Sequence, residues 1–519
     1  MLRGFPGPGT VSVVSGHVPL LNDPKRPPHV LVKALSEQYR GIFRLRLFWR
    51  QAIYITDPFL LQEVFAAERA GIIEKPVAQL MKVKGKTERN MFSERSGNYK
   101  WKLVRKAVAP AFSTANLKVF HHHITTVVDN LIACIKARGP SVPVDIANIT
   151  QRESFDVIGR VGFDHDFGVS RRIDVSPAFG GEPDVFDVFK TMLGETGKRF
   201  NNPMRFLSRT GEASKGERAS MRVLQMSRQL MEECRANKDL DERSIAAHLL
   251  QIVDPTNGKP LTLDRLEDEA SVMFVAGSET TGYSIAWTLY LLAKHPEAMA
   301  KLEAELDEMG LLVTPARPRP RTFAFADISK LRYLDAILKE SMRMRPVVTG
   351  GSLRVVARDL RLSNGLVLPR GITITGSNLS LLNNPTLWEH PERFMPERFE
   401  DPEVVYVERA SPANGNAHVE AAHGGAYDGI ADYRGSANKA LRYTPFGNGM
   451  RNCVGQQLAK VNMPTALGML VSNFKFELTP ETAAMTMADL ETVRGTLQFK
   501  DGLYMFCTPR DAPAAASSA

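Results

Sequence analysis

The longest run of apolar residues with helical spacing predicts a helix from Leu263 to Lys294. Thr262 is a suitable N-cap residue, and His295, which a proline follows, marks the end of the pattern. The middle of the run, SVMFVAGSETTGYSIAW, is apolar on almost every side, as is typical of a helix buried within a protein. At 1.5 Å per residue this helix is about 45 Å long, so we expect it to cross a large domain.

Shorter elements surround this helix in the sequence. KLRYLDAILKESMRMR predicts a second helix that ends before Pro346, and the chain from Pro58 to about Leu250 is mainly helical in its periodicity. IFRLRL and QAIYIT predict a β-hairpin, and LRVVA, LRLS, LVLP and ITITG predict short strands. We therefore expect a fold that is mainly α with a minor β portion (α+β).

The same pattern favours one large domain over residues 31–510. Residues 1–30 are a proline/glycine hinge and N-terminal segment, which contains FPGPG. Residues 403–440 are rich in Ala, Gly and Asn, which predicts a surface insertion, and residues 511–519 predict a disordered tail.

Composition narrows the class of protein. The 519 residues are 43% hydrophobic and 24% charged, values typical of a soluble globular chain, and no apolar run is long enough to span a bilayer. The net charge of +9 favours a basic face for an acidic partner or an anionic membrane surface. No Lys/Arg run is interleaved with aromatic residues, so we expect no binding of nucleic acid. The four cysteines form no CxxC pair, which excludes a zinc finger.

One cysteine lies in a loop of special composition, FGNGMRNCVG, which holds Cys453. The three glycines of this loop allow backbone N–H groups to approach the sulfur, and Arg451 adds a positive charge that favours a thiolate. A helical pattern from Gln456 onwards places the sulfur near a helix N-terminus, where negative charge is stabilised. The alternative is a small core residue in a turn. A thiolate metal ligand fits the loop better, and a porphyrin would supply four nitrogen ligands to the same metal.

The loop residues Phe446, Gly449, Arg451, Cys453 and Gly455 resemble the haem-binding signature F-x-x-G-x-R-x-C-x-G of the cytochrome P450 monooxygenases. WKLVR, AGSETT, KESMR and PERF resemble further motifs of this family, in the family's order and along nearly the whole chain. The resemblance implies the cytochrome P450 fold, with haem b between the long central helix and the cysteine loop. It also implies that Cys453 is the axial ligand of the iron, and that Phe446, Gly447 and Gly455 contact the haem.

AGSETT, Ala276 to Thr281, resembles the oxygen-activating motif of the family's long helix. The resemblance implies that Ala276 and Gly277 lie against the haem, that Thr280 donates a hydrogen bond to bound oxygen, and that Glu279 relays protons. A glycine and a hydroxyl within a helix can open its hydrogen-bond ladder. The alternative is a packed notch of small residues, with Thr280 bonded to its own backbone.

KESMR places Glu340 and Arg343 three residues apart on one helical face, where they can pair. An ordinary surface ion pair is the alternative. In the family a later arginine joins this pair in a buried structural network. PERF occurs twice here, and family spacing assigns that role to Arg398 of the second copy rather than to Arg393, because Phe394 fills the position before it.

Four residues resemble those that bind the haem propionates in the family: Trp101 and Arg105 of WKLVR, Arg354 and Arg451. An indole N–H and guanidinium groups are suitable donors for carboxylates. For Trp101 alone, packing in the core is the alternative.

The resemblance implies a haem-thiolate monooxygenase that inserts one oxygen atom from O2 into a lipophilic small molecule of the sterol, terpenoid, carotenoid or fatty acid class. The predicted substrate contacts are Met91, Phe92, Phe274, Val347, Val348, Thr496 and Leu497. One alternative is an O2-independent isomerase or dehydratase that acts on a hydroperoxide, which the presence of Glu279 and Thr280 disfavours. A non-catalytic haem-binding protein is the other.

The haem domain accounts for the whole chain, so we expect electrons from a separate NADPH–reductase or a ferredoxin that docks near the Cys453 loop. The FPGPG hinge and the PERF element resemble the eukaryotic microsomal branch, which implies the cytosolic side of the endoplasmic reticulum membrane and contact with its surface. That branch has an N-terminal anchor, which this sequence lacks, so the cytosol or a plastid stay as alternatives. We expect a monomer.

Overall fold

The fold was analysed in a computed structural model, which describes residues 4–21, 23, 26–76, 89–173, 184–201, 211–408 and 439–511. Most of the predicted insertion (409–438) and of the predicted tail (512–519) therefore lies outside the described residues. Among the helices that are described, none combines the length and apolar character needed to cross a membrane.

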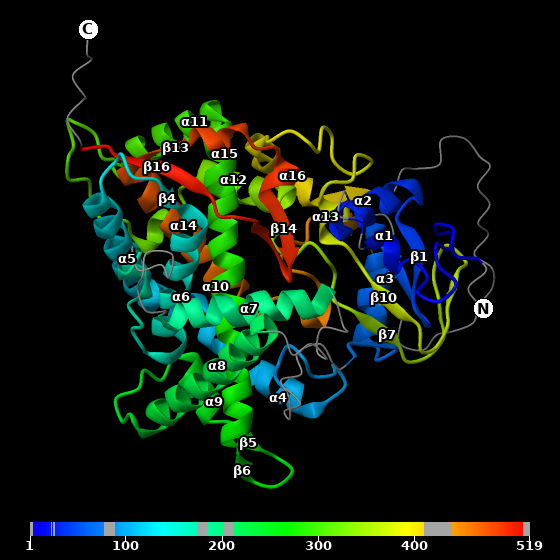
Figure 1. The fold of residues 1–519 in the computed structure, drawn as a ribbon. Coiled ribbons are helices and arrows are strands. Elements are labelled where there is room, and N and C mark those ends of the chain that lie inside the picture. Colours follow the sequence, from blue (N-terminus) through cyan, green and yellow to red (C-terminus); the bar gives the residue numbers. More distant parts are fainter. Residues whose placement is uncertain are drawn as a thin grey trace.

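The long central helix is α10, Leu263–Lys294, as the sequence predicts. The Thr262 hydroxyl accepts a hydrogen bond from the backbone N–H of Arg265 at 3.3 Å, and His295 caps the other end. In Figure 1 α10 runs through the middle of the molecule, with α6 and α8 beside it. At Gly282 a Cβ atom would lie 2.6 Å from the Gln151 Cα, so this glycine allows α6 to pack closely against α10.

Helices make up most of the structure. They are α1 (Val18–Leu21), α2 (Pro28–Gln38), α3 (Pro58–Arg69), α4 (Tyr99–Val108), α5 (Thr114–Arg138), α6 (Ile146–Phe163), α7 (Val185–Asn201), α8 (Gly211–Ala236), α9 (Ile245–Leu250), α11 (Pro296–Glu308), α12 (Arg332–Met344), α13 (Asn378–Leu382), α14 (Gln456–Asn473), α15 (Pro480–Ala484) and α16 (Met487–Leu490). The largest apolar core lies among α5, α6, α10, α12 and α14, where Ile124, Phe155 and Leu467 are fully buried. These helices enclose the middle of α10, so its side chains can form an interior site.

The main sheet has five strands in the order β1-β2-β10-β7-β3. They are β1 (Ile42–Leu47), β2 (Arg50–Ile55), β3 (Ile73–Glu74), β7 (Arg354–Val356) and β10 (Thr373–Thr375). The predicted hairpin is present, because β1 and β2 pair antiparallel from Ile42 opposite Ile55 to Leu47 opposite Arg50. Figure 1 shows this sheet and α3 on one side of the molecule, opposite α5.

The remaining strands form smaller sheets. β13 (Phe474–Leu478), β16 (Tyr504–Pro509) and β4 (Val144–Asp145) form a three-stranded sheet. Four hairpin-like pairs complete the β portion: β5 (Val253–Asp254) with β6 (Lys259–Pro260), β8 (Leu360–Arg361) with β9 (Val367–Leu368), β11 (Tyr406–Glu408) with β12 (Lys439–Leu441), and β14 (Glu491–Arg494) with β15 (Thr496–Phe499). β11 and β12 lie at the two described ends of the predicted insertion and pair with each other, so these two ends are adjacent. The predicted class, mainly α with a minor β portion, is confirmed.

Candidate active site

The cysteine loop precedes α14 and is held by its own backbone. The Cys453 N–H donates to the Phe446 carbonyl at 2.9 Å. Gly447 and Gly449 have φ angles of 70° and 74°, in the left-handed region that glycine favours. Gly449 also packs on α3, because a Cβ atom there would lie 3.0 Å from Phe65 Cδ1. Gly455 has a φ of −82° and space for a Cβ atom, so the fold of the chain does not itself demand glycine there.

The Cys453 thiol is free and accessible to solvent on one side. Burial on its other sides raises the pKa of this thiol, while the hydrogen bond from the Gly455 N–H and the charge of Arg105 lower it. Arg105, which the sequence predicts as a ligand of the cofactor, therefore also favours the thiolate form of Cys453. Arg105 is held at this place by its hydrogen bond to Asn452 Oδ1, at 2.5 Å.

Arg451 instead faces the segment before α4. Its Nη2 atom is within 3.1 Å of the carbonyl oxygen of Met91 and within 3.0 Å of those of Phe92 and Glu94. Its Cζ atom lies 4.4 Å from the ring centroid of Trp101, which is buried in α4. Its Nη1 atom is buried and has no hydrogen-bond partner among the described residues. The Nη1 group of Arg451 can therefore donate a hydrogen bond to a group outside the described residues, such as a ligand.

Cations gather at this end of the cysteine loop: Lys75, Arg105, Arg354 and Arg451, which we call the cation cluster. Burial and then the nearby charges of Arg451 and Arg354 lower the pKa of Lys75 to about 7. Burial and then Arg354 lower the pKa of Arg451 to about 9. Glu68 of α3 compensates Arg354, with Oε1 2.8 Å from its Nε. The cluster therefore has more buried positive than negative charge, which fits the haem carboxylates that the resemblance predicts here.

Sequence reasoning missed Glu68 and Lys75. Glu68 continues the buried stripe of α3, four residues after Val64 and eight after Leu60, so its position on an apolar face was a readable signal. Lys75 follows the short strand β3 and gave no such signal. Its Nζ donates to the Phe92 carbonyl and lies 3.8 Å from the centre of the Phe92 ring.

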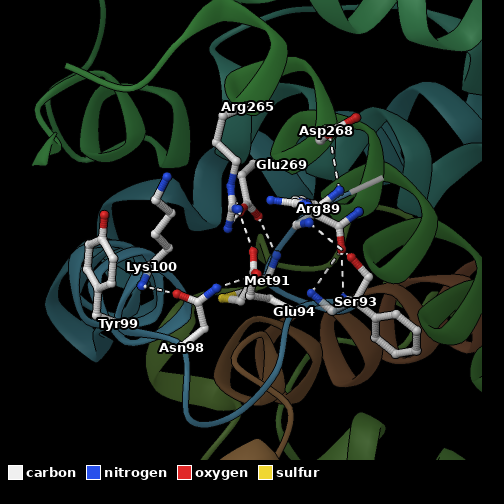
Figure 2. Close-up of polar contacts among 12 residues, drawn as sticks. Arg89, Met91, Ser93, Glu94, Asn98, Tyr99, Lys100, Arg265, Asp268 and Glu269 are labelled. Carbon is white, nitrogen blue, oxygen red and sulfur yellow. Dashed lines mark hydrogen bonds and ion pairs between the residues drawn. The ribbon is translucent and has the colours of Figure 1, made fainter. Parts of the chain in front are cut away.

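The segment before α4 is also tied to the first turns of α10, as Figure 2 shows. Glu269 accepts a hydrogen bond from the Met91 N–H at 2.9 Å, and the Arg265 Nη1 lies 2.7 Å from Glu94 Oε2. Asp268 accepts from the Arg89 N–H at 3.2 Å. Burial raises the pKa of Glu269 to about 7, although Arg265 opposes that shift. The cysteine loop, α4 and α10 are therefore joined through residues 89–94.

In the middle of α10, part of one helix face is accessible to solvent although most of the helix is buried. Ala276 is exposed and Thr280, one turn later on the same face, is half-buried, while Phe274 and Ser278 are buried. The Thr280 hydroxyl donates to the Ala276 carbonyl at 2.7 Å, which is the backbone bond of the alternative interpretation. Gly277, next to Ala276, is half-buried and packs against α6, because a Cβ atom there would lie 2.9 Å from Ile158. The glycine serves helix packing, and α10 continues through it.

Glu279 is buried and turned towards β15. Its Oε1 accepts a hydrogen bond from Gln498 Nε2 at 2.6 Å. Burial raises the pKa of Glu279 to about 7. A carboxyl group of this kind can change its charge near neutral pH, which is a requirement for a proton relay.

The predicted charge network is complete and closed. Glu340 Oε2 and Oε1 lie 2.7 and 2.9 Å from Nε and Nη2 of Arg343, and Arg398 Nε lies 3.2 Å from Glu340 Oε1. Glu340 and Arg343 are fully buried. The Arg393 side chain is mostly exposed, and its backbone carbonyl accepts a weak bond from Arg343 at 3.3 Å. The second PERF copy therefore supplies the charged partner.

The structure separates the predicted substrate contacts into two groups. Phe274 is fully buried and stacks on Phe163 with ring centroids 4.7 Å apart, so it packs in the aromatic core. Thr496, Leu497 and Val347 are also buried. Phe92 and Val348 are exposed and Met91 is half-buried, so these three residues have side chains that a ligand can reach.

Comparison with known proteins agrees with the motifs. The family model described as cytochrome P450 matches residues 6–500. A cytochrome P450 of Caenorhabditis elegans is 24% identical, and the alignment covers 98% of this chain and 93% of that protein. A self-sufficient cytochrome P450 monooxygenase of Phanerodontia chrysosporium is 23% identical over 98% of this chain and 43% of its own length. A bifunctional cytochrome P450/NADPH–P450 reductase of Bacillus subtilis is 25% identical over 88% of this chain and 38% of its own length.

Proposed function

The chain belongs to the cytochrome P450 family of haem-thiolate monooxygenases, and from this premise we propose that Cys453 is its axial ligand and a lipophilic small molecule its substrate. The expected family, enzyme class and haem cofactor are confirmed by the family match. The substrate class, taken as a sterol, terpenoid, carotenoid or fatty acid, and the residue roles are the proposal. Haem bound through a thiolate activates dioxygen, so that one oxygen atom enters the substrate and the other leaves as water.

The residues of this chain divide the work between two sides of the site. Cys453 would hold the iron through its thiolate, and Trp101, Arg105, Arg354 and Arg451 would bind the two carboxylates of the cofactor. On the α10 side the Thr280 hydroxyl would be the hydrogen-bond donor, and Glu279 the proton source, that oxygen activation requires. Thr280 can leave its bond to Ala276 by rotation about one side-chain bond, because its face of the helix is accessible.

One observation carries this proposal: an accessible thiol at the start of α14 lies beside a buried cluster with a surplus of positive charge. The reduced protein with carbon monoxide tests it. Wild-type protein should show the red-shifted Soret band of thiolate ligation, and Cys453→Ala should lose it. Cys507→Ala, which removes a buried thiol elsewhere in the fold, is the control and should keep the band. Retention of the band in Cys453→Ala would rule out the assigned ligand.

The presence of Glu279 and Thr280 also favours a monooxygenase over an isomerase or dehydratase that acts on a hydroperoxide. Oxygen activation needs a hydroxyl donor and a proton source, and both lie in the middle of α10. A hydroperoxide rearrangement needs neither. Consumption of NADPH and O2 in the presence of a panel of lipophilic compounds should therefore occur with this protein, whereas turnover of a lipid hydroperoxide alone would favour the isomerase or dehydratase.

We propose that the electrons come from a separate NADPH–reductase or ferredoxin. The fused relative from Bacillus subtilis joins a cytochrome P450 to an NADPH–P450 reductase, which supports a donor of this type. A hollow of about 310 Å³ lies beside the cysteine loop, where Asn448, Phe65, Arg69 and Lys439 are among its lining residues. Its two cations suit an acidic donor, although Lys439 also pairs with Glu403. Reduction by each donor, with Arg69→Glu as the variant, tests this face.

We further propose contact with an anionic membrane surface, in agreement with a site on the cytosolic face of the endoplasmic reticulum. The most exposed apolar side chains are those of Val13, Trp49 and Val14, at 90%, 84% and 80%. They lie together, because the Phe48 N–H donates to the Ser15 carbonyl at 3.1 Å. Residues 1–22 and 40–56 contain arginines and no acidic residue. Apolar tips beside arginines suit a lipid interface.

Trp49 makes this contact measurable, since Trp101, Trp287 and Trp388 are all buried. Vesicles of phosphatidylserine and phosphatidylcholine that carry brominated chains should quench the Trp49 fluorescence. Val13→Ser with Val14→Ser should weaken vesicle binding, whereas Tyr504→Ser, at an exposed aromatic residue elsewhere, should not. Equal binding of all three proteins would contradict the contact.

A further inference from the structure

Three polar side chains are buried together in an apolar region between α10 and β15. Glu279, Thr496 and Gln498 are exposed by 6%, 7% and 8%. Leu497 and Trp287, which lie beside them, are exposed by 1% or less. Buried polar groups in such surroundings are costly unless they bind one another, so their hydrogen bonds decide how each is oriented.

Gln498 is the centre of this group. Its Nε2 donates to Glu279 Oε1 at 2.6 Å and to the Thr496 hydroxyl at 3.1 Å, so both amide protons are used. Thr496 in turn contributes a hydrogen bond to Glu279. Residues 496 and 498 lie on the same face of β15, because side chains alternate along a strand. One strand thus holds the carboxyl group at two points.

The strand itself has little freedom to move. Gln498 pairs with Thr492 of β14, and the Leu497 N–H donates to the Val347 carbonyl at 2.7 Å. The Trp287 indole of α10 donates to the Leu497 carbonyl at 3.3 Å, and the Trp287 ring stacks on Phe499 with centroids 3.9 Å apart. β15 is therefore fixed to the same helix that carries Glu279, eight residues before Trp287.

Other titratable groups around Glu279 come from α7, α10 and β14. The charge of Lys190 on α7 lowers the pKa of Glu279, and burial lowers the pKa of the Lys190 ammonium itself. Tyr283 lies one turn along α10, and Arg494 of β14 acts on that phenol. The attraction of Lys190 favours the charged form of Glu279, but burial outweighs it, and the pKa of Glu279 is raised to about 7. Hydrogen bonds from β15 to the Glu279 carboxylate therefore help to set the pKa of this group.

Glu279 and Thr280 point to different sides of the helix, because consecutive residues are about 100° apart. Thr280 is on the accessible face and Glu279 is on the β15 side. We propose that Gln498 is a positioning residue, which holds the Glu279 carboxyl on the β15 side and sets how readily it takes up and releases a proton. The inference rests on the proposed role of Glu279 and adds to it the residue that controls that acid.

Infrared titration of the haem-loaded ferric protein tests this without turnover. The carbonyl band of protonated carboxyl groups loses a component as each buried acid ionises, and Glu279→Gln identifies the Glu279 component. Gln498→Leu removes a donor to the charged form, so the midpoint of this component should rise by about one to two pH units. Gln498→Glu has the same size and places a second carboxyl beside the first, so the midpoint should rise as well.

A second buried pair provides the control. Glu153, whose pKa burial raises to about 8, accepts from Asn462 Nδ2 at 3.4 Å, so Asn462→Leu removes an amide donor from a different acid. It should leave the Glu279 component unmoved. An unchanged Glu279 midpoint in either Gln498 variant would overturn the inference. The proposed function has a separate test: it fails if the wild-type protein lacks the Soret band of thiolate ligation.

Discussion

Two groups of buried arginines differ in role: one stabilises the fold, and the other is suited to an anionic ligand. Arg343 and Arg398 meet Glu340, and Nη1 of Arg343 and Nη2 of Arg398 bind backbone carbonyls. Among the described residues, neither arginine has a buried nitrogen without a partner, so this network is closed. In the cation cluster Arg451 keeps one nitrogen without a partner among the described residues. A buried charge with complete bonding is part of the scaffold, whereas a buried surplus of one sign is suited to a ligand of the other sign.

Breaking the closed network should have the largest effect. Arg343→Ala leaves Glu340 as a buried carboxylate with fewer partners and should cost about 3–5 kcal/mol in the free energy of unfolding. Arg398→Ala should cost less, because its side chain is 10% exposed and gives Glu340 one bond. Denaturant unfolding of the haem-loaded proteins measures both losses. A stable Arg343→Ala protein would show that the network does not hold the core.

Removing a charge from the cation cluster should weaken haem binding and have little effect on the stability of the haem-free fold. Arg451→Leu removes a buried cation that Arg354 repels, and also the donor to the carbonyls of residues 91–94. These two effects oppose each other, so the haem-free chain should unfold at nearly the same denaturant concentration. Loss of a charge-assisted bond of about 1.5–3 kcal/mol should speed haem transfer to apomyoglobin by roughly tenfold or more. Arg358→Leu, at an exposed arginine, is the matched control and should change neither quantity. Equal transfer rates in the two variants would contradict the assignment.

The cluster should also give the haem-free protein a pH dependence. The pKa of Lys75 is lowered to about 7 in the folded chain, so from pH 7 up to its ordinary value the unfolded chain binds more protons. Stability should therefore rise with pH in this window, by up to about 1.4 kcal/mol per pH unit. Lys75→Met should lose the rise, and bound haem should flatten it, since its carboxylates favour the charged ammonium. Urea midpoints at several pH values measure the slope.

The smallest effect is expected at the duplicated motif. The Arg393 side chain is 66% exposed and its nearest acid, Glu392, is 3.9 Å away. Arg393→Ala should change the free energy of unfolding by less than about 0.5 kcal/mol, because the carbonyl that Arg343 uses is retained. A cost as large as that of Arg398→Ala would mean that the two copies share the role.

Local pattern was sufficient to predict much of the fold. The ends of α10 follow from Thr262, a hydroxyl that caps the helix, and from His295 before a proline. The hairpin β1–β2 follows from two β-rich runs joined by a short turn. The choice of Arg398 over Arg393 came from the resemblance, and the contact with Glu340 at 3.2 Å agrees with it.

The site was harder to predict because its contacts join distant segments. Arg354 meets Glu68, 286 residues away, and Gln498 meets Glu279, 219 residues away. Periodicity reports the face of an element but not which other element covers it. Periodicity therefore did not show that α6 packs against Gly277 or that Phe163 stacks on Phe274.

The contact of Arg451 with residues 91–94 has a thermodynamic consequence. One guanidinium holds these carbonyls and also faces the place proposed for the haem carboxylates, so the two interactions are linked. Linkage is reciprocal: whatever factor the bound cofactor contributes to the ordering of residues 91–94, the ordering of those residues contributes to the retention of the cofactor. At the proposed site, a substrate that binds against Phe92 would therefore change how firmly the protein retains its haem.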